Sequence, residues 1–140
     1  MSRITKTIGS MAAAVIFVMV TALPLNADPI VKQDERYKLV LTTKVTPDGK
    51  KEATIVVTPK PTYHNNMDYP WKVTLKSGPG VTPDTKYKKK KNPPDPTFKE
   101  EKVTFKIPTD NSTTEKVKAE IKMSHCNDKQ CWSAKVALEW

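Results

Sequence analysis

Apolar and polar residues alternate with a period of two along most of this chain. In segment 36–45, for example, Tyr37, Leu39 and Leu41 fall on one face of an extended backbone. Such alternation is typical of a β-strand that is buried on one side, because successive side chains of a strand point to opposite faces. After residue 27, no segment combines the apolar spacing of a helix with residues that cap helix ends.

The alternation predicts six strands, at residues 36–45, 51–59, 71–77, 102–108, 115–123 and 131–140. Pro47, Asp48 and Gly49 lie between the first two strands, and these residue types favour tight turns. Segment 60–70 is polar and flanked by prolines, which predicts a loop. Short strands separated by turns predict an all-β fold, an antiparallel β-sandwich of the immunoglobulin type.

Segment 77–101 does not have the alternation of a strand. Its 25 residues contain five prolines, two glycines and a run of lysines at residues 88–91. Loops of this length are uncommon in compact domains and are usually functional or disordered. The sequence leaves two interpretations open, a loop with a function and a flexible loop exposed to solvent.

The first 27 residues have the order of features found in a secretory signal peptide. Arg3 and Lys6 form a basic start, a long apolar run follows, and Ala27 is a small residue just before a polar stretch. We therefore expect cleavage after Ala27, which leaves one mature domain at residues 28–140, in the periplasm or secreted, with no stable membrane insertion. The alternative is an uncleaved N-terminal anchor, although the apolar run is somewhat short for a bilayer.

Positive charge dominates the composition. The chain has 24 lysines and arginines against 15 aspartates and glutamates, and the predicted signal peptide contains two of the basic residues and no acidic one. The mature chain therefore has a net charge of about +7. The excess is almost entirely lysine, whereas nucleic-acid-binding proteins more often combine arginine with aromatic residues. The near absence of arginine therefore argues against a nucleic-acid partner. The positive charge instead indicates solubility, or attraction to acidic partners or membrane surfaces.

Cys126 and Cys131 are the only cysteines of the chain. In an exported protein, two thiols this close tend to oxidise to a disulfide and to stay paired. If the last two strands form a hairpin in which Cys126 faces Cys131, then apolar residues face each other in four further pairs: Met123–Ala134, Ile121–Val136, Ala119–Leu138 and Val117–Trp140. A slip by one residue would expose the core side chains of one strand. The apolar pattern therefore favours this register independently of the cysteines.

This register has consequences for the cysteine pair. The two residues would lie directly opposite each other at the hairpin tip, on its polar face, with Cα atoms roughly 5.5 Å apart. A disulfide that closes so short a loop stabilises a protein by only about 2 kcal/mol. Exposed disulfides exchange more readily than buried ones, and His125 and Lys129 would lower a thiol pKa while Asp128 would oppose them. From the residues alone, a reactive pair and a structural pair both remain open.

Two stretches of the chain resemble a known family. SHCNDKQCWSAK, at residues 124–135, lies between two alternating strands, and TYHNNMDYPWKVTL, at residues 62–75, combines a polar loop, a Tyr-Pro step and a strand. Both are similar to the N-terminal periplasmic domain of the thiol:disulfide interchange protein DsbD and to related disulfide bond corrector domains. The resemblance implies an immunoglobulin-like sandwich whose Cys-x4-Cys hairpin cycles between dithiol and disulfide, without a bound cofactor. It also implies that the hairpin passes electrons between periplasmic proteins.

The resemblance further implies roles for individual residues. Cys131 would form the mixed disulfide with a partner, and Cys126 would resolve it. In the family, a cap loop with aromatic side chains shields the pair. Segment 77–101 is therefore the candidate cap, and Tyr87 or Phe98 is the candidate shield.

Two departures from the family pattern are visible. Trp132 keeps the bulky residue that follows the second cysteine, but the prolines that often come next are missing. The chain has no Cys-x-x-Cys motif, so its electrons would come from a separate thioredoxin-like or other disulfide-exchange protein. The sequence leaves open whether such a relay is an enzymatic protein-disulfide reductase.

Other kinds of site have weaker support. Residues with soft-metal donor atoms occur at His64, Met67, Met123 and His125, but Met123 faces the core in the register above. We therefore expect no metal and no cofactor. No serine lies in a nucleophile-elbow motif, which argues against a hydrolase. The rival hypothesis is a secreted binding or structural module of the immunoglobulin type whose hairpin disulfide is inert.

Overall fold

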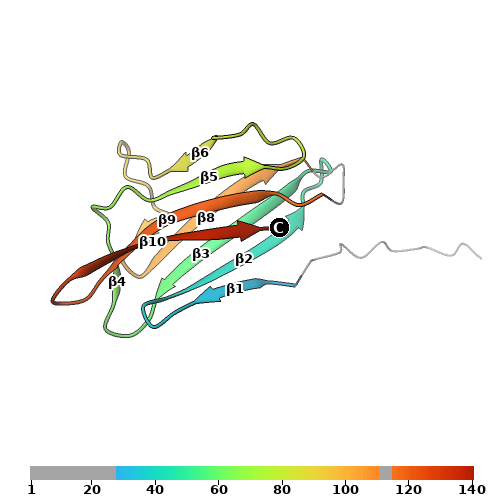
Figure 1. Ribbon diagram of the computed structural model, residues 1–140. Helices are drawn as coiled ribbons and strands as arrows, with labels where there is room; N and C mark the ends of the chain where they lie inside the picture. The colour runs from blue at the N-terminus through green and yellow to red at the C-terminus, as the bar shows by residue number, and fades with distance from the viewer. Residues whose placement is uncertain (1–27, 111–114) are drawn as a thin grey trace, which may run out of the picture.

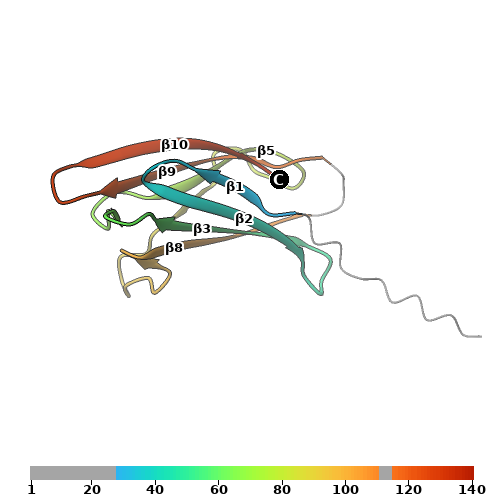
Figure 2. The same cartoon turned by 90° about the horizontal axis from the view of Figure 1, so that it is seen from below.

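The computed structural model describes residues 28–110 and 115–140, which form two antiparallel β-sheets packed face to face (Figure 1). Figure 2 shows the two layers from the side. The described residues contain no helix, and so none that is long and apolar enough to cross a membrane. The all-β antiparallel sandwich predicted from the alternating pattern is confirmed. The predicted signal peptide, residues 1–27, lies outside the described residues.

The first sheet has the strand order β1–β2–β3–β8–β7. Its strands are β1 (Ile30–Gln33), β2 (Tyr37–Val45), β3 (Lys51–Pro59), β8 (Lys102–Thr109) and β7 (Phe98–Lys99). The predicted turn joins β2 to β3, and in it the Thr46 N–H donates to the Lys50 carbonyl oxygen at 2.7 Å. Gly49 has a φ of 79° in this turn, a conformation that residues with side chains disfavour.

The second sheet has the strand order β10–β9–β5–β6, and β4 also pairs with β9. Its strands are β4 (His64–Asn65), β5 (Lys72–Ser77), β6 (Lys86–Lys88), β9 (Lys118–Cys126) and β10 (Cys131–Glu139). On one side, β10 pairs with the whole of β9. On the other side, β5 pairs with the first part of β9 and β4 pairs with its last two residues. The tip of the β9–β10 hairpin projects at one end of the sandwich (Figure 1).

The core consists of the side chains on the facing sides of the two sheets. The first sheet contributes alternate residues of its long strands, namely Tyr37, Leu39, Leu41, Ala53, Ile55, Val57, Val103, Phe105 and Ile107. The second sheet contributes Val73, Leu75, Ala119, Ile121, Met123 and Leu138. These sets follow the predicted alternation. The removal of this apolar surface from water is the main stabilisation of the sandwich.

The predicted register of the C-terminal hairpin is confirmed. Cys131 pairs with Cys126, and the pairing continues without a shift to the open end of the hairpin. There, the main chains of Val117 and Trp140 exchange hydrogen bonds of 2.7 and 3.0 Å. The odd-numbered residues of β9 face the core, so its even-numbered residues, among them Cys126, lie on the outer face of the sheet.

The structure also contains short strands that the alternating pattern does not predict: β1, β4, β6 and β7. Segment 77–101 is therefore not the strandless loop expected, because β6 adds an edge strand to the second sheet and β7 adds one to the first. Strands of two to four residues are too short for alternation to identify them. The strand predicted at 115–123 begins at Lys118 and extends to Cys126.

Candidate functional site

A disulfide joins Cys126, the last residue of β9, to Cys131, the first residue of β10. Their Cα atoms are 4.0 Å apart, closer than the sequence analysis expected. The Asn127 N–H donates to the Gln130 carbonyl oxygen at 2.9 Å, so Asn127 and Gln130 form a hydrogen-bonded pair. Hydrogen-bonded and non-hydrogen-bonded pairs alternate along antiparallel strands, so the cysteines form a non-hydrogen-bonded pair. In such pairs the Cα atoms of the two strands are closest. Asn127 Oδ1 accepts hydrogen bonds from the N–H groups of Lys129 and Gln130, at 2.8 and 2.9 Å, and these bonds fix the turn.

The two cysteines differ in their exposure to solvent. Cys126 is 5% exposed, whereas Cys131 is exposed to solvent, as are the turn residues Asp128, Lys129 and Gln130. Because β10 is an edge strand, Cys131 has a neighbouring strand on one side only. Cys126 lies between β10 and β4, where His64 is its cross-strand partner. The Cys131 side of the disulfide is therefore the side that faces solvent.

Buried polar contacts hold β4 beside Cys126. Asn65 is fully buried, and its side-chain amide donates to the carbonyl oxygens of Lys99 and Val57, at 3.2 and 3.4 Å, which belong to the first sheet. The next residue, Asn66, donates its N–H to the Ser124 carbonyl oxygen at 2.9 Å. Because buried amides need hydrogen-bond partners, these bonds fix β4, a strand of the second sheet, against the first sheet.

His125 precedes Cys126, but its side chain lies on the opposite face of β9, in the core. The residue is 1% exposed, and its imidazole stacks on Tyr37 at 5.0 Å and meets Trp71 edge-on at 5.5 Å, measured between ring centroids. Burial lowers the pKa of His125 from 6.5 to about 4, and the nearby Asp34 carboxylate opposes this change. The neutral ring supplies no positive charge to a thiol at pH 7, which corrects the pKa-tuning role predicted for His125.

The structure places a different histidine beside the cysteine pair. His64 faces Cys126 across the β4–β9 ladder, on the outer face of the second sheet. Directly opposed residues of antiparallel strands have Cβ atoms about 5 Å apart, close enough for their side chains to touch. Alternation does not reveal this neighbour, because a two-residue strand has no recognisable period. Its sequence signal is its place in segment 62–75, the second stretch of the family resemblance.

Trp132 lies on the inner face of β10, beneath the hairpin tip. Its ring packs against Tyr63, with centroids 5.8 Å apart, and the guanidinium carbon of Arg36 is 4.8 Å from its centroid. This aromatic and cation–π cluster supports the base of the hairpin from the inside. Lys129, the other residue predicted to tune a thiol pKa, lies in the exposed turn.

Tyr87 and Phe98 do not lie over the cysteine pair. Tyr87 belongs to β6 and packs against the edge of the core. Phe98 is buried in the core, where its ring meets Phe105 edge-on at 5.0 Å. The shielding role predicted for these two rings is therefore corrected, since the segment that lies beside Cys126 is the one that contains β4.

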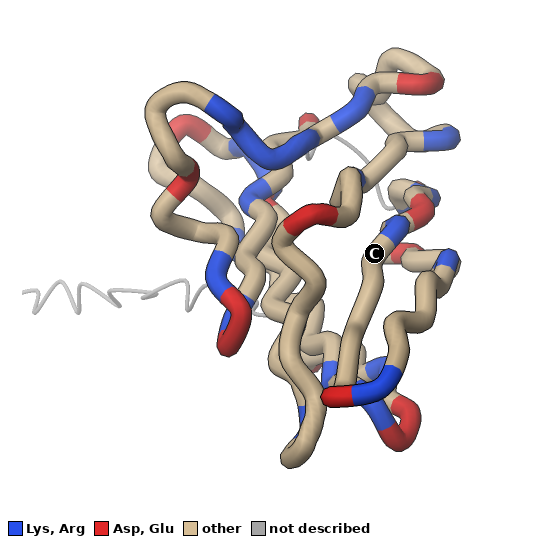
Figure 3. Tube along the Cα trace, turned by 90° about the vertical axis from the view of Figure 1, so that its left-hand side faces the viewer, with Lys and Arg blue, Asp and Glu red and all other residues tan. Residues whose placement is uncertain are grey.

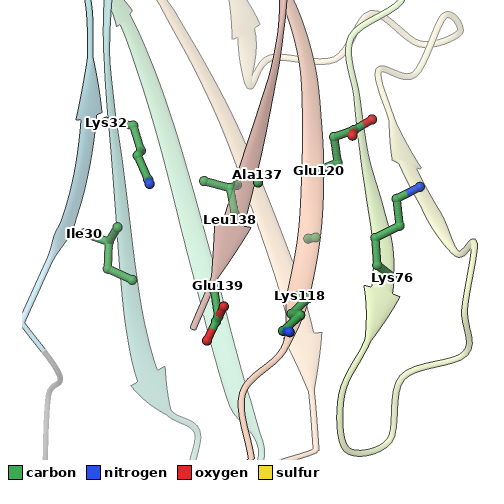
Figure 4. A pocket seen from close by; sticks show the side chains of 9 residues that line it. Ile30, Lys32, Lys76, Lys118, Glu120, Ala137, Leu138 and Glu139 are labelled. Carbon is green, nitrogen blue, oxygen red and sulfur yellow. The ribbon is translucent and has the colours of Figure 1, made fainter.

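Other parts of the described chain offer no clearer site. Within residues 28–110 and 115–140, no group of three or more His, Cys, Asp or Glu side chains is placed to hold a metal ion. A pocket at the open end of the β9–β10 hairpin is lined by Lys118, Glu120 and Glu139 among others (Figure 4). Its mixture of lysines, glutamates and aliphatic side chains has no arrangement specific to a catalytic reaction.

Comparisons of this chain with protein-family models, with curated proteins and with solved structures returned no match. The assignment of a function therefore depends on the chemistry of the described residues. Among these residues, the disulfide at the hairpin tip is the group with a reaction of its own, the exchange of its sulfur–sulfur bond with a thiolate.

Proposed function

We propose that this chain is an exported thiol-disulfide exchange module that passes electrons between protein partners. The observation that carries the proposal is the asymmetry of the disulfide, in which Cys131 is exposed and Cys126 is buried. The resemblance of two sequence stretches to the N-terminal domain of DsbD supports the same function and a periplasmic location.

In the reductive half of the cycle, a partner thiolate attacks Sγ of Cys131. A bond forms between the partner sulfur and Cys131, and the bond between Cys131 and Cys126 breaks, so that Cys126 leaves as a thiolate. A second thiolate of the same partner then attacks the partner sulfur and releases Cys131. The partner is oxidised to a disulfide, and this chain gains two electrons as a dithiol.

In the second half, the Cys131 thiolate attacks the disulfide of an acceptor protein. One acceptor sulfur bonds to Cys131, and the other leaves as a thiolate. The Cys126 thiolate then attacks Sγ of Cys131, re-forms the disulfide and releases the acceptor as a dithiol. Since the two sulfur atoms hold both electrons, the proposed cycle requires no cofactor.

The reduction potential of the pair tests whether it can act in such a cycle. The protein is equilibrated in thioredoxin or glutathione redox buffers, and its free thiols are counted by alkylation and mass spectrometry. We expect half-reduction at a potential above about −300 mV, because structural disulfides of exported proteins typically lie below that value. A pair that is still oxidised below about −300 mV would contradict the proposal and favour the rival function, a secreted binding or structural module with an inert disulfide.

Two matched variants test the roles of the two sulfurs. Cys126→Ser leaves the exposed Cys131 without a resolving thiol, so we expect it to accumulate mixed disulfides with thiol proteins in cells. Cys131→Ser leaves only the buried Cys126 and serves as the control, for which we expect far less trapping. Equal trapping by the two variants would contradict the assignment of Cys131 as the attacked sulfur.

A further inference from the structure

Four lysines form a straight row across the outer face of the second sheet. Register pairs Lys135 with Lys122, Lys122 with Lys72, and Lys72 with Lys88, so each of the strands β10, β9, β5 and β6 contributes one residue. At the usual spacing of β-strands the row is about 14 Å long. At the β6 end it continues into the lysines at residues 88–91, which form an unbroken blue stretch in Figure 3.

This lysine row is electrostatically unfavourable for the isolated chain. Like charges directly opposite each other on neighbouring strands destabilise a sheet. The charge of Lys122 lowers the pKa of Lys72, and the desolvation of Lys72 and the charges of Lys86, Lys88 and Lys135 lower it further. The salt bridges of the described residues involve Arg36, Lys44 and Lys116 but none of the four lysines of the row.

Few carboxylates interrupt the positive charge near the lysine row. Glu120 lies on the same face of β9, opposite Thr74 of β5. Asp68 shares a pocket with Lys72 and Lys88 beside the β6 end. Neither carboxylate forms a salt bridge with the row, so the positive charge of this face is available to a partner.

The lysine row and the cysteine pair lie on the same face of the molecule. Lys122 is four residues before Cys126 on β9, and Lys135 is four residues after Cys131 on β10. Even-numbered positions of β9 share the outer face. Because four residues of a strand span about 13 Å, the lysine row lies about that distance from the disulfide. A protein of ordinary size that rests on the row therefore also reaches Cys131.

We propose that the lysine row is the docking surface for an acidic face of the protein that exchanges electrons with Cys131. The exchange reaction in this inference rests on the proposed function, whereas the binding of an acidic partner to the lysine row does not. The row would attract a partner with carboxylates beside its reactive thiol and would orient that thiol towards the exposed sulfur. It would repel partners with basic surroundings, so it selects among thiol proteins by charge.

An acidic protein fits this face better than an anionic membrane. Interfacial membrane binding combines basic residues with apolar side chains that enter the lipid. The exposed large hydrophobic residues of the described chain are Val31 and Val45, which belong to β1 and β2 of the first sheet. A bilayer on the lysine row would also cover Cys131 and so exclude its partners.

The reaction is tested with two synthetic peptides that carry one cysteine flanked by glutamates or by lysines. The rate at which each peptide attacks the oxidised wild-type protein is measured at low and high salt. Each rate is then divided by the rate at which the same peptide attacks hydroxyethyl disulfide, a small uncharged disulfide. This division removes the effect of the flanking charges on the thiol pKa. We expect the acidic peptide to react at least about 10-fold faster at low salt. We expect this preference to disappear at about 0.5 M salt, where charges are screened.

Matched variants show whether the row causes this preference. Lys122→Glu/Lys135→Glu should abolish or reverse it, and the milder Lys122→Gln/Lys135→Gln should reduce it. Lys38→Glu/Lys106→Glu makes the same change of charge on the first sheet and should leave the preference intact. Equal preferences in the two glutamate variants would overturn the inference.

Binding is measured separately with the same peptides after replacement of their cysteine by serine. Binding of the acidic peptide that depends on the row supports the docking surface, even if no thiol peptide reacts; that result would contradict the exchange function alone. No binding of the acidic peptide overturns the docking surface, even if both thiol peptides react equally well. Binding to vesicles containing phosphatidylglycerol, without binding to the acidic peptide, also overturns it and indicates a membrane partner.

Discussion

At the scale of single residues, His125 and Cys126 show that adjacent residues of a strand point to opposite faces of the sheet. They are adjacent in sequence, but one side chain lies among the rings of the core and the other lies on the outer face, opposite His64. Sequence proximity therefore suggested the wrong histidine as the neighbour of the cysteine pair. The imidazole of His125 has a structural role in the core, and this role makes it sensitive to acid.

The first prediction concerns this sensitivity. The pKa of His125 is about 4 in the folded protein, because of burial, against 6.5 for an exposed histidine. Between these values the unfolded chain binds the proton more readily, so the stability contributed by the neutral ring is complete above pH 6.5 and is lost as the pH falls towards 4. We expect the free energy of unfolding, measured with urea, to decrease by up to about 3 kcal/mol across this window.

The control for this prediction is His125→Phe, which keeps an aromatic ring in the core and removes the titrating group. Its free energy of unfolding should change much less between pH 6.5 and 4. Hydrogen bonds from Thr46 and Thr97 lower the pKa values of Asp48 and Asp95, so the stability that these carboxylates contribute is lost at a lower pH than that of His125. Both aspartates are still present in the variant, so they affect it and the wild type equally. An equal pH dependence in the wild type and in His125→Phe would contradict the prediction.

At the scale of elements, the β9–β10 hairpin has two sources of register. The first is its apolar face, which meets the core along the whole hairpin, and the second is the disulfide at the tip. β5 and β4 also hold β9 from its other side. We therefore expect the fold to persist when the disulfide is opened.

The second prediction follows from this arrangement. Cys126→Ala/Cys131→Ala should remain folded, with a free energy of unfolding lower by about 2 kcal/mol, because the disulfide closes only a short loop. The measurement is urea denaturation of the variant and of the oxidised and reduced wild type, followed by tryptophan fluorescence. The reduced wild type should resemble the variant. An unfolded double variant would show that the disulfide is a structural requirement and would weaken the case for a redox cycle.

At the scale of the whole molecule, positive charge is distributed unevenly. The lysine row joins strands that lie far apart in the sequence, and it lies on the same face as the exposed cysteine. We therefore expect this repulsive surface to lower the stability of the chain at low ionic strength. Such a cost is expected of a surface that serves a partner.

The third prediction measures this cost. Lys122→Gln removes the charge that most strongly affects Lys72, so we expect a higher unfolding temperature than for wild type at about 20 mM salt. The difference should disappear at about 0.5 M salt, where the repulsion is screened. The control Lys44→Gln removes a salt bridge to Glu52, 3.4 Å long, and should give no gain at either salt concentration. A loss of stability in Lys122→Gln that does not depend on salt would show that packing of its alkyl chain dominates.

The long strands and the hairpin register were predictable because they follow from local rules. A strand of seven to nine residues that is buried on one side has a recognisable alternation, as in β2, β3 and β9. In the hairpin, a slip by one residue would turn the apolar side chains of one strand to solvent, so the pattern favoured the register in which Cys126 faces Cys131. The neighbour of Cys126 in β4 was not predictable in this way, and the family resemblance pointed instead to segment 77–101.

The sequence by itself determined the class of fold, the hairpin and the face on which its cysteines lie, because each depends on the two-residue period of neighbouring strands. Only the tertiary structure decided which segments lie beside them. It brings His64 against Cys126 and aligns lysines from four strands, two of which are distant from the hairpin in sequence. These placements depend on the pairing of β4 and β5 with β9, on the pairing of β6 with β5, and on the packing of this sheet against the core. Long-range pairing of this kind leaves no periodic signal in short segments.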